Sequence, residues 1–205
     1  MVLYAVMPRA KKRVPAKDTP ALRVLSSALS YKGPLFTVTT DLVEEPNGVT
    51  ATRDLIRHSG SIVILPVDNA TKDAEPRVLL IQQYRYAANA FIWEIPAGRI
   101  EPGEDQLESA KRELKEETGF SAKRWKPILH FYVSPGFLGE VMYVYMASGL
   151  IPGEAEPEED EKITCQFFPL SKAVRMCLTG KIIDAKTISA IFWIFAQFKS
   201  NSGRR

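Results

Sequence analysis

Cysteine is scarce in this chain, and no apolar run is long enough to cross a membrane. The 205 residues include only Cys165 and Cys177, whose separation matches no zinc-binding or CxxC redox pattern. We therefore expect no disulfide framework, and because both cysteines lie in apolar stretches, we expect buried thiols in a reducing cytoplasm. No stretch approaches the roughly 20 apolar residues of a membrane-spanning helix. These absences favour a cytoplasmic protein without membrane contact, and the length suits one domain.

Net charge is also small, but it is unevenly distributed. The formal net charge of +3 is too low to indicate a nucleic-acid partner. Residues 1–40 hold seven Lys or Arg and one acid, whereas residues 154–161 (EAEPEEDE) hold six acids and no base. The first segment predicts a basic arm over residues 1–34 that is partly disordered, and the second predicts a solvated loop.

From Leu35 onward, strand patterns surround one internal helix, and two helices close the chain. LFTVTTDLV and VTATRDLI flank the turn signal EEPNG and predict a β-hairpin. SIVILPV is a nearly continuous apolar run, which predicts a buried strand. We expect further strands at PRVLLIQQYR, FIWEIP, KPILHFYV, VMYVYMA and ITCQFFPL. This order predicts an α+β fold, a mixed-sheet α/β/α sandwich. In the last helix, from about Ala185, the spacing predicts one buried face, made by Ile188, Ile191, Phe192 and Phe195.

The internal helix is expected to run from about Asp105 to a stop at Gly119. Glu113, Glu116 and Glu117 share one face of it, because residues three and four apart are neighbours on a helix. A solvated, salt-bridged face is the simpler interpretation. However, these acids lie at the helix end that the macrodipole makes negative, where carboxylates are least favourable. Clustered carboxylates suit Mg²⁺, with Mn²⁺ as the alternative, so the pattern predicts a divalent-cation site.

The complete spacing of this segment resembles the Nudix box. It consists of Gly98, five residues, Glu104, seven residues, and then REL-x-EE-x-GF from Arg112 to Phe120. Every fixed position of the box is present, so the chain resembles the Nudix hydrolases. The resemblance implies that carboxylates hold divalent cations against a substrate diphosphate while a water attacks phosphorus. The implied metal ligands are Glu113, Glu117, Glu116 and the backbone carbonyl of Ala97.

The resemblance also implies roles for the residues that support these ligands. Arg112 orients the helix carboxylates by a charge-assisted hydrogen bond, and Glu104 anchors that arginine and the preceding loop. Gly98 and Gly119 serve the backbone geometry of the box.

Outside the box, the chain is similar to the ADP-ribose pyrophosphatase subgroup. Pro135 in YVSPGFLGE stands fifteen residues after the box. RDLIRHSGSIVILP, QQYRYAANAFIWEIPAG and GKIIDAKTISAIFWI are similar to segments of that subgroup, so the resemblance covers residues 35–198. It implies that Pro135 belongs to the substrate site.

Further substrate contacts follow from the same resemblance. Arg85 would contact the substrate phosphates, and Glu94 would line the site beside the box. Arg53 and Phe36 would lie near the adenine, and Glu140 would reach the terminal ribose. A surface salt bridge is the alternative for each charged residue, and ordinary core packing is the alternative for Phe36.

The acidic loop carries the implied catalytic base. Related enzymes place a glutamate on this loop, just before the next strand, which is expected to begin at Ile163. Glu161 matches that position best, Glu159 is the alternative, and Glu116 is the candidate if the loop is only solvated. A mobile loop carrying the base would close over bound substrate.

Together these features predict a Nudix domain over residues 35–199, including an N-terminal dimerisation hairpin, followed by a tail at 200–205. The expected reaction is Mg²⁺-dependent hydrolysis of ADP-ribose to AMP and ribose 5-phosphate, by a cytoplasmic homodimer. One alternative is a Nudix enzyme for another nucleoside diphosphate derivative, such as a sugar nucleotide or dinucleotide, or for a nucleoside triphosphate. The other is a sensor that binds ADP-ribose without cleaving it.

Overall fold

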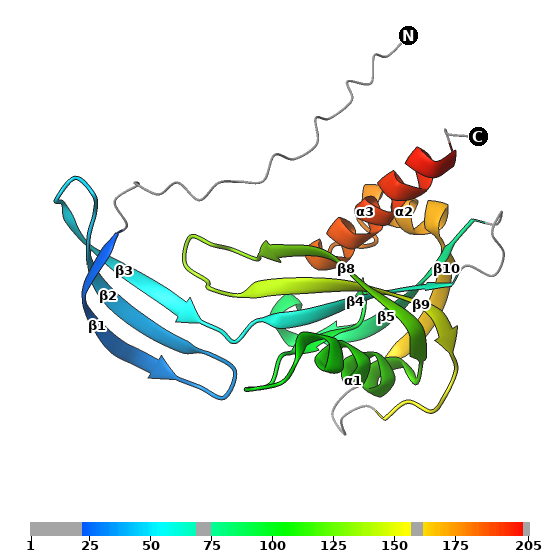
Figure 1. The fold of residues 1–205 in the computed structure, drawn as a ribbon, viewed down its shortest axis with the longest axis horizontal. Helices are drawn as coiled ribbons and strands as arrows, with labels where there is room; N and C mark the ends of the chain where they lie inside the picture. Colours follow the sequence, from blue (N-terminus) through cyan, green and yellow to red (C-terminus); the bar gives the residue numbers. More distant parts are fainter. Residues whose placement is uncertain (1–21, 69–74, 157–161, 203–205) are drawn as a thin grey trace, which may run out of the picture.

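The structure is a computed structural model that describes residues 22–68, 75–156 and 162–202. The strands of these residues form two sheets (Figure 1). The smaller sheet is antiparallel and contains β1 (Arg23–Lys32), β2 (Thr37–Glu44) and β3 (Thr50–Arg57), in that order. The larger sheet has the order β10-β5-β4-β9-β8, with β6 beside β5 and β7 beside β4. Its strands are β4 (Ser61–Asp68), β5 (Arg77–Arg85), β6 (Ala90–Glu94), β7 (Ala97–Arg99), β8 (Ser121–Tyr132), β9 (Val141–Ile151) and β10 (Thr164–Pro169).

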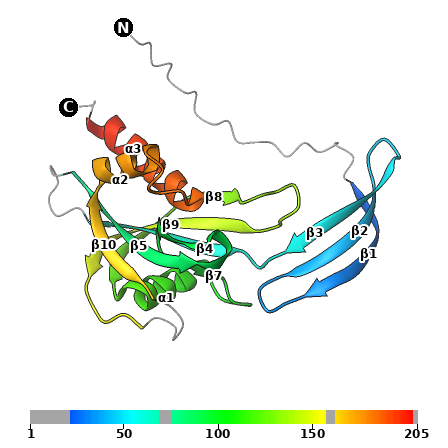
Figure 2. The same cartoon turned by 180° about the vertical axis from the view of Figure 1, so that it is seen from behind.

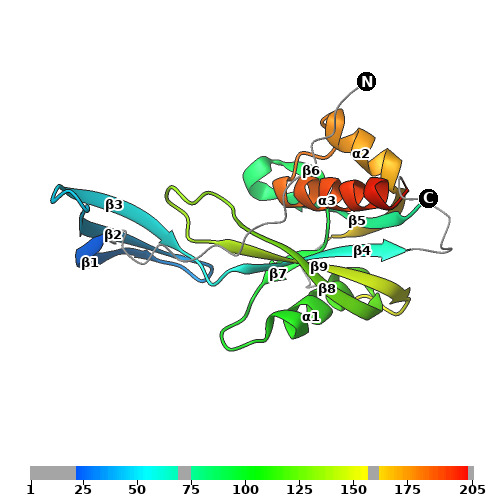
Figure 3. The ribbon, with the colours of Figure 1, turned by 45° about the horizontal axis from the view of Figure 1, so that its top comes forward.

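Helices cover both faces of the larger sheet, which confirms the predicted sandwich. One face carries α1 (Gln106–Thr118), and the other carries α2 (Leu170–Leu178) and α3 (Ala185–Ser202) (Figure 3). The sheet is mixed because β4 and β9 are parallel and its other pairs are antiparallel. Seen from behind, β10 lies at an edge beside β5 (Figure 2). None of the helices in the described ranges is long and apolar enough to cross a bilayer.

Strand β4 lies inside the larger sheet, and its sequence is almost continuously apolar. Side chains alternate between the two faces of a strand, and both faces of β4 are covered. Ile62 and Ile64 pack in the cluster that includes α1 residues. The alternate residues Val63, Leu65 and Val67 pack in the cluster that includes α2 and α3 residues. The prediction of a buried strand is confirmed.

The internal helix α1 begins and ends as its sequence predicts. Asp105 caps its first turn, where the carboxylate accepts hydrogen bonds from the backbone N–H groups of Leu107 and Glu108. Gly119 ends it with φ of 73°, a left-handed conformation that favours glycine. Ala110 and Leu114 are fully buried against the sheet, and Glu113 and Glu117 are buried beside them on the same side of the helix.

The N-terminal sheet differs from the prediction. The expected hairpin is present as β2 and β3, but β1 adds a third strand along β2. The prediction of an arm over residues 1–34 is therefore wrong for residues 23–32, while residues 1–21 lie outside the described ranges, as do residues 203–205 of the expected tail. All ten residues of β1 are exposed, so the strand has no alternation of buried and exposed residues by which its sequence would indicate a strand. Its backbone pairing with β2 is what defines it.

Asp41 joins the three strands of this small sheet. Its carboxylate accepts a hydrogen bond from Ser27 Oγ of β1 at 2.6 Å and forms an ion pair with Arg57 Nη2 of β3 at 2.6 Å. Asp41 is only 1% exposed, and a buried carboxylate needs such partners to offset the loss of hydration.

The last helix buries a slightly different face from the one predicted. Ile191 is fully buried, and Ile188 and Phe195 pack partly buried against the same core. Phe192 is 37% exposed, so its predicted burial is wrong, and Ile194 is buried instead. A helix that packs against only one layer buries a stripe, and Phe192 falls on the flank of that stripe.

The two cysteines have no disulfide, but only one of them approaches the expected burial. Cys177 is half-buried, whereas Cys165 is exposed, which contradicts the prediction for Cys165. It lies on β10, an edge strand, and its thiol donates to the backbone oxygen of Glu117 at 3.5 Å. Partial desolvation raises the pKa of both thiols.

Backbone contacts attach the N-terminal sheet to the larger one. At the end of β3, Ile56 N donates to the oxygen of Phe137 at 2.7 Å, and Ile56 O accepts from Gly139 N at 2.9 Å. Arg99 of β7 reaches back to the oxygen of Pro34, at 2.8 Å from its Nη1. The loop between β8 and β9 and the start of the box are therefore both fastened to the N-terminal sheet.

Candidate active site

The carboxylates of α1 lie against the short strand β7. Glu117 is 4% exposed and Glu113 is 9% exposed, although both side chains are carboxylates. Glu117 Oε2 accepts a hydrogen bond from Ala97 N at 3.1 Å. Glu116 lies one turn from Arg112, toward the solvent-exposed side of the helix. All three predicted carboxylates are thus gathered at one end of α1, beside the residue that was expected to offer a backbone carbonyl.

Because Gly98 has no side chain, the Glu113 carboxylate can lie directly against strand β7. A Cβ atom built on Gly98 would lie 2.0 Å from the carboxyl carbon and from Oε1 of Glu113. The Glu113 carboxylate therefore occupies the space that a side chain at position 98 would need. Gly119 has a similar role at the other end of α1, since a Cβ there would meet Ala155 N and Gly153 O at 2.7 Å.

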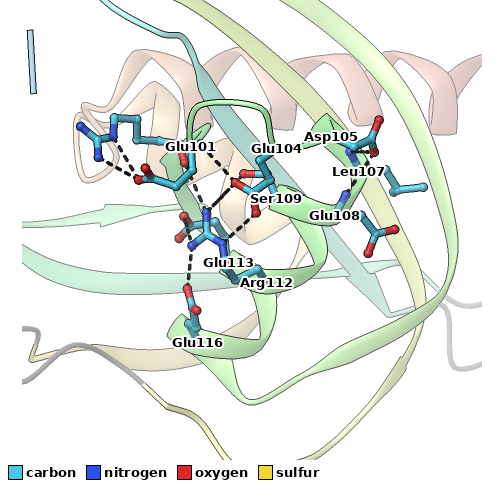
Figure 4. Close-up of polar contacts among 10 residues, drawn as sticks. Glu101, Glu104, Asp105, Leu107, Glu108, Ser109, Arg112, Glu113 and Glu116 are labelled. Atoms are coloured by element: carbon cyan, nitrogen blue, oxygen red, sulfur yellow. Dashed lines mark hydrogen bonds and ion pairs between the residues drawn. The ribbon is translucent and has the colours of Figure 1, made fainter.

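Arg112 holds two of the carboxylates and the loop before the helix (Figure 4). Its guanidinium binds both oxygens of Glu104, from Nε at 3.0 Å and from Nη2 at 3.1 Å. Its Nη1 contacts Glu113 at 2.7 Å and Glu116 at 2.9 Å. The hydrogen bond from Arg112 lowers the pKa of Glu104 to about 2. The expected contacts of Arg112 with Glu104 and with the helix carboxylates are present.

The chemistry of this helix face fits a hard divalent cation. Three carboxylates within five positions offer the oxygen ligands that Mg²⁺ and Mn²⁺ prefer, and Gly98 leaves them room. Among residues 22–68, 75–156 and 162–202, no three His, Cys, Asp or Glu side chains converge closely enough to enclose an ion. The carboxylates of this helix face are ligands of the type that a divalent cation prefers. The carboxylate oxygens that would bind the cation are held in place by Arg112 and by the Ala97 N–H.

Arg85 and Glu94 form a second charged group beside the box. Arg85 Nε lies 2.7 Å from Glu94 Oε1, and its Nη2 lies 3.0 Å from Oε2. Glu94 is fully buried, whereas the side chain of Arg85 is 39% exposed. Burial lowers the pKa of Arg85, but the hydrogen bonds and charge of Glu94, with more distant effects of Glu117 and Asp184, raise it above its ordinary value. The guanidinium is therefore a permanent positive charge.

Glu140 and Pro135 lie on the loop between β8 and β9. Glu140 accepts a hydrogen bond from Ser61 Oγ at 2.5 Å, and His58 Nδ1 lies 3.9 Å away. His58 Nδ1 accepts a hydrogen bond from Gly60 N at 3.0 Å. Pro135 belongs to the turn that leads into the contacts with Ile56.

Arg53 and Phe36 belong to the N-terminal sheet rather than to the body that carries the box. Arg53 Nη2 pairs with Glu45 at 2.6 Å on the neighbouring strand end. Phe36 is 38% exposed and packs its ring against Tyr31, with centroids 5.6 Å apart. Within one chain, the contacts of these two residues are made inside the N-terminal sheet. Their expected place near the adenine stays a prediction.

The predicted catalytic bases Glu159 and Glu161 lie outside the described residues. The segment before them runs along the end of α1, where Glu156 N donates to Glu116 O at 3.1 Å. Lys115 Nζ pairs with the Glu156 carboxylate at 2.9 Å. The acidic segment therefore starts beside the carboxylate face, and the role of Glu159 and Glu161 stays a prediction.

Comparison with known proteins identifies the family of this chain. The NUDIX domain model matches residues 57–191, which is more than half of the chain. The chain therefore belongs to the Nudix hydrolases, and it is an enzyme of that family. Nudix hydrolases generally use a divalent metal ion, in accordance with the carboxylate face of α1.

Individual relatives share most of this chain. It is 34% identical to the ADP-ribose pyrophosphatase of Bacillus subtilis over 166 residues, which is 80% of this chain and 87% of the relative. It is 34% identical to the methanol dehydrogenase activator of Bacillus methanolicus over 169 residues, covering 82% and 89%. A crystal structure of an ADP compounds hydrolase superposes with a TM-score of 0.76 at 25% identity, covering 91% of this chain and 98% of the other.

One group of polar residues near the site was not predicted from the sequence. Asp184, Lys186 and Thr187 at the start of α3 contact the strand and the loop that precede the box. The stretch Asp184-Ala-Lys-Thr before an apolar helix is a recognisable capping signal. It did not indicate that the same residues reach β6, because that contact joins segments 92 residues apart.

Proposed function

We propose that this enzyme hydrolyses the diphosphate bond of ADP-ribose, with Mg²⁺, to AMP and ribose 5-phosphate. The observation that carries the proposal is the complete carboxylate face of α1 against Gly98, in a chain similar to ADP-ribose pyrophosphatases over four-fifths of its length. An intact box argues against a binding protein without catalysis, since a sensor has no need to keep three buried or half-buried carboxylates together.

In this proposal each group beside the box has a separate task. Glu113, Glu116 and Glu117 would hold the cation, and Arg112 keeps two of them oriented before substrate arrives. A bound divalent cation supplies Lewis-acid stabilisation of the charge that develops on the diphosphate. Arg85 would bind the same phosphates as a permanently charged donor.

Proton removal from the attacking water is assigned to the acidic loop. We expect Glu161→Gln to lower kcat about 100-fold or more, with KM largely unchanged, because a general base acts mainly in the transition state. Glu156→Gln is the matched control, since Glu156 pairs with Lys115 on the surface, and Glu158→Gln is a second. A large loss in Glu159→Gln and none in Glu161→Gln would exchange the two roles. Equal, mild effects in all four would move the base to Glu116.

The working unit is proposed to be a homodimer that pairs through the N-terminal sheet. Val24, Leu25, Leu29 and Tyr31 are exposed on β1, and several exposed apolar side chains on one strand favour a contact with another protein chain. Light scattering at micromolar concentration should give twice the chain mass. Leu29→Glu is expected to give a monomer, whereas Val49→Glu, an exposed change in the β2–β3 turn, should leave the dimer intact. A fully active wild-type monomer would refute the proposal.

The substrate is tested by incubating the protein with ADP-ribose, sugar nucleotides, dinucleotides and nucleoside triphosphates, and identifying the products. We expect AMP and ribose 5-phosphate from ADP-ribose with the highest kcat/KM in the panel. Mg²⁺ should support turnover better than Mn²⁺ at cellular concentrations. Preference for another member of the panel would keep the family chemistry and change the substrate. We also propose a cytoplasmic location, in keeping with free thiols.

A further inference from the structure

A buried ion network lies outside the box, where α3 meets β6. Lys186 is 7% exposed, and its ammonium forms an ion pair with the fully buried Glu94. The same ammonium lies 3.1 Å from Asp184 Oδ1. Glu94 therefore has two cationic partners, Lys186 inside the protein and Arg85 at the surface. A lysine is rarely buried to this degree without a specific partner.

The first turn of α3 fixes this lysine in place. Asp184 caps the helix, since its Oδ2 accepts from Thr187 N at 3.0 Å and from Thr187 Oγ1 at 2.5 Å. The Thr187 hydroxyl in turn accepts from Ile95 N at 2.9 Å. Ile95 follows Glu94 directly and leads to Ala97. The side chains of Lys186 and Thr187 thus tie the start of α3 to Glu94 at the end of β6 and to the backbone N–H of Ile95, and α3 lies near β6 in Figure 3.

The charges of this network balance only when Lys186 is present. Glu94 and Asp184 contribute two negative charges, and Arg85 and Lys186 contribute two positive charges. Without Lys186, Arg85 would be the remaining cation beside two buried or half-buried carboxylates. Such a site would hold the Arg85 guanidinium more tightly toward the interior, and its net negative charge would oppose an approaching diphosphate.

We propose that Lys186 is a positioning residue for substrate binding, which holds Glu94 in the orientation that presents Arg85 to the substrate diphosphate. The inference deepens the proposed function, because it rests on Arg85 contacting the phosphates. Lys186 itself does not touch substrate. A purely structural lysine would stabilise α3 and leave substrate affinity unchanged, and this difference can be measured.

The test compares steady-state kinetics of four proteins, namely wild type, Lys186→Met, Arg85→Ala and the double variant, with ADP-ribose and Mg²⁺. We expect Lys186→Met to raise KM about tenfold while kcat stays within about threefold, the pattern of lost binding that is common to ground and transition states. Because Lys186 acts through Arg85, the double variant should have the KM of Arg85→Ala alone. Independent, multiplying effects on KM would overturn the inference, as would an unchanged KM in Lys186→Met.

Two further variants separate positioning from stability. Lys186→Arg keeps the charge and should recover most of the wild-type KM. Ile191→Val removes a buried methyl group from the same helix, and it should lower Tm without changing KM. If Lys186→Met does not fold, Lys186→Gln keeps a donor without charge and should show the same rise in KM; a folded Lys186→Gln with wild-type KM refutes the inference. Failure of the wild type to cleave ADP-ribose would instead remove the proposed substrate.

Discussion

Glu117→Gln is expected to lower turnover by about 100-fold or more while the protein stays folded. Glu117 is one of the carboxylates that would hold the divalent cation, and a Lewis acid with its positioning is worth several kcal/mol. The amide that replaces the carboxylate keeps an oxygen that can accept from Ala97 N, as Glu117 Oε2 does. The fold therefore loses little. The measurement is kcat with ADP-ribose at saturating Mg²⁺, together with thermal unfolding.

Glu108→Gln is the matched control for this change. Glu108 lies on the same helix and pairs with Lys111 at the surface, where its side chain is 62% exposed. Such pairs contribute a few tenths of a kcal/mol, so both turnover and stability should stay near wild type. Mg²⁺ should raise Tm in the wild type and in Glu108→Gln, and raise it less in Glu117→Gln. Turnover of Glu117→Gln within about threefold of wild type would remove the assignment of the metal site.

Gly98→Ala is expected to remove most activity by displacing one carboxylate. The added Cβ would lie 2.0 Å from the Glu113 carboxyl group, so Glu113 must move out of its place beside β7. A shift of about 1 Å in a group that positions the reaction can cost on the order of 100-fold in rate. The φ angle of Gly98 is not in the left-handed region, so alanine strains no backbone there. Turnover should fall strongly while Tm changes little.

The contrasting control is Gly103→Ala in the loop before α1. Gly103 has φ of +83° and no atoms within 4 Å of a built Cβ. Alanine there should cost about 1–2 kcal/mol of stability through backbone strain and leave turnover near wild type. Glu113→Asp added to Gly98→Ala shortens the displaced side chain and should restore part of the activity. Normal turnover in Gly98→Ala would show that the position of Glu113 does not matter to the reaction.

Local signals in the sequence predicted the parts of the site that depend on near neighbours. The limits of α1 follow from a capping Asp105, a left-handed Gly119 and apolar spacing between them. The grouping of the three glutamates follows from the same helical period. The buried strand β4 was recognisable because both of its faces are covered, and that leaves a continuous apolar run.

Features that depend on distant partners could not be predicted in this way. Strand β1 has ten exposed residues, so only its pairing with β2 reveals it. Phe192 fits the helical period of α3, but it is 37% exposed. Ile194 is buried instead, because it lies on the face of α3 that packs against the core.

The sequence by itself determined the chemistry of this protein, because the box lies within a single short segment, Gly98 to Phe120, and its spacing sets which side chains share a helix face. The tertiary structure alone decided how that face is supported. The Glu113 carboxylate fills the space over Gly98 because β7 passes beside α1, and Lys186 reaches Glu94 because α3 packs over β6. Contacts of this kind depend on the packing of layers, which residue type and local spacing do not encode.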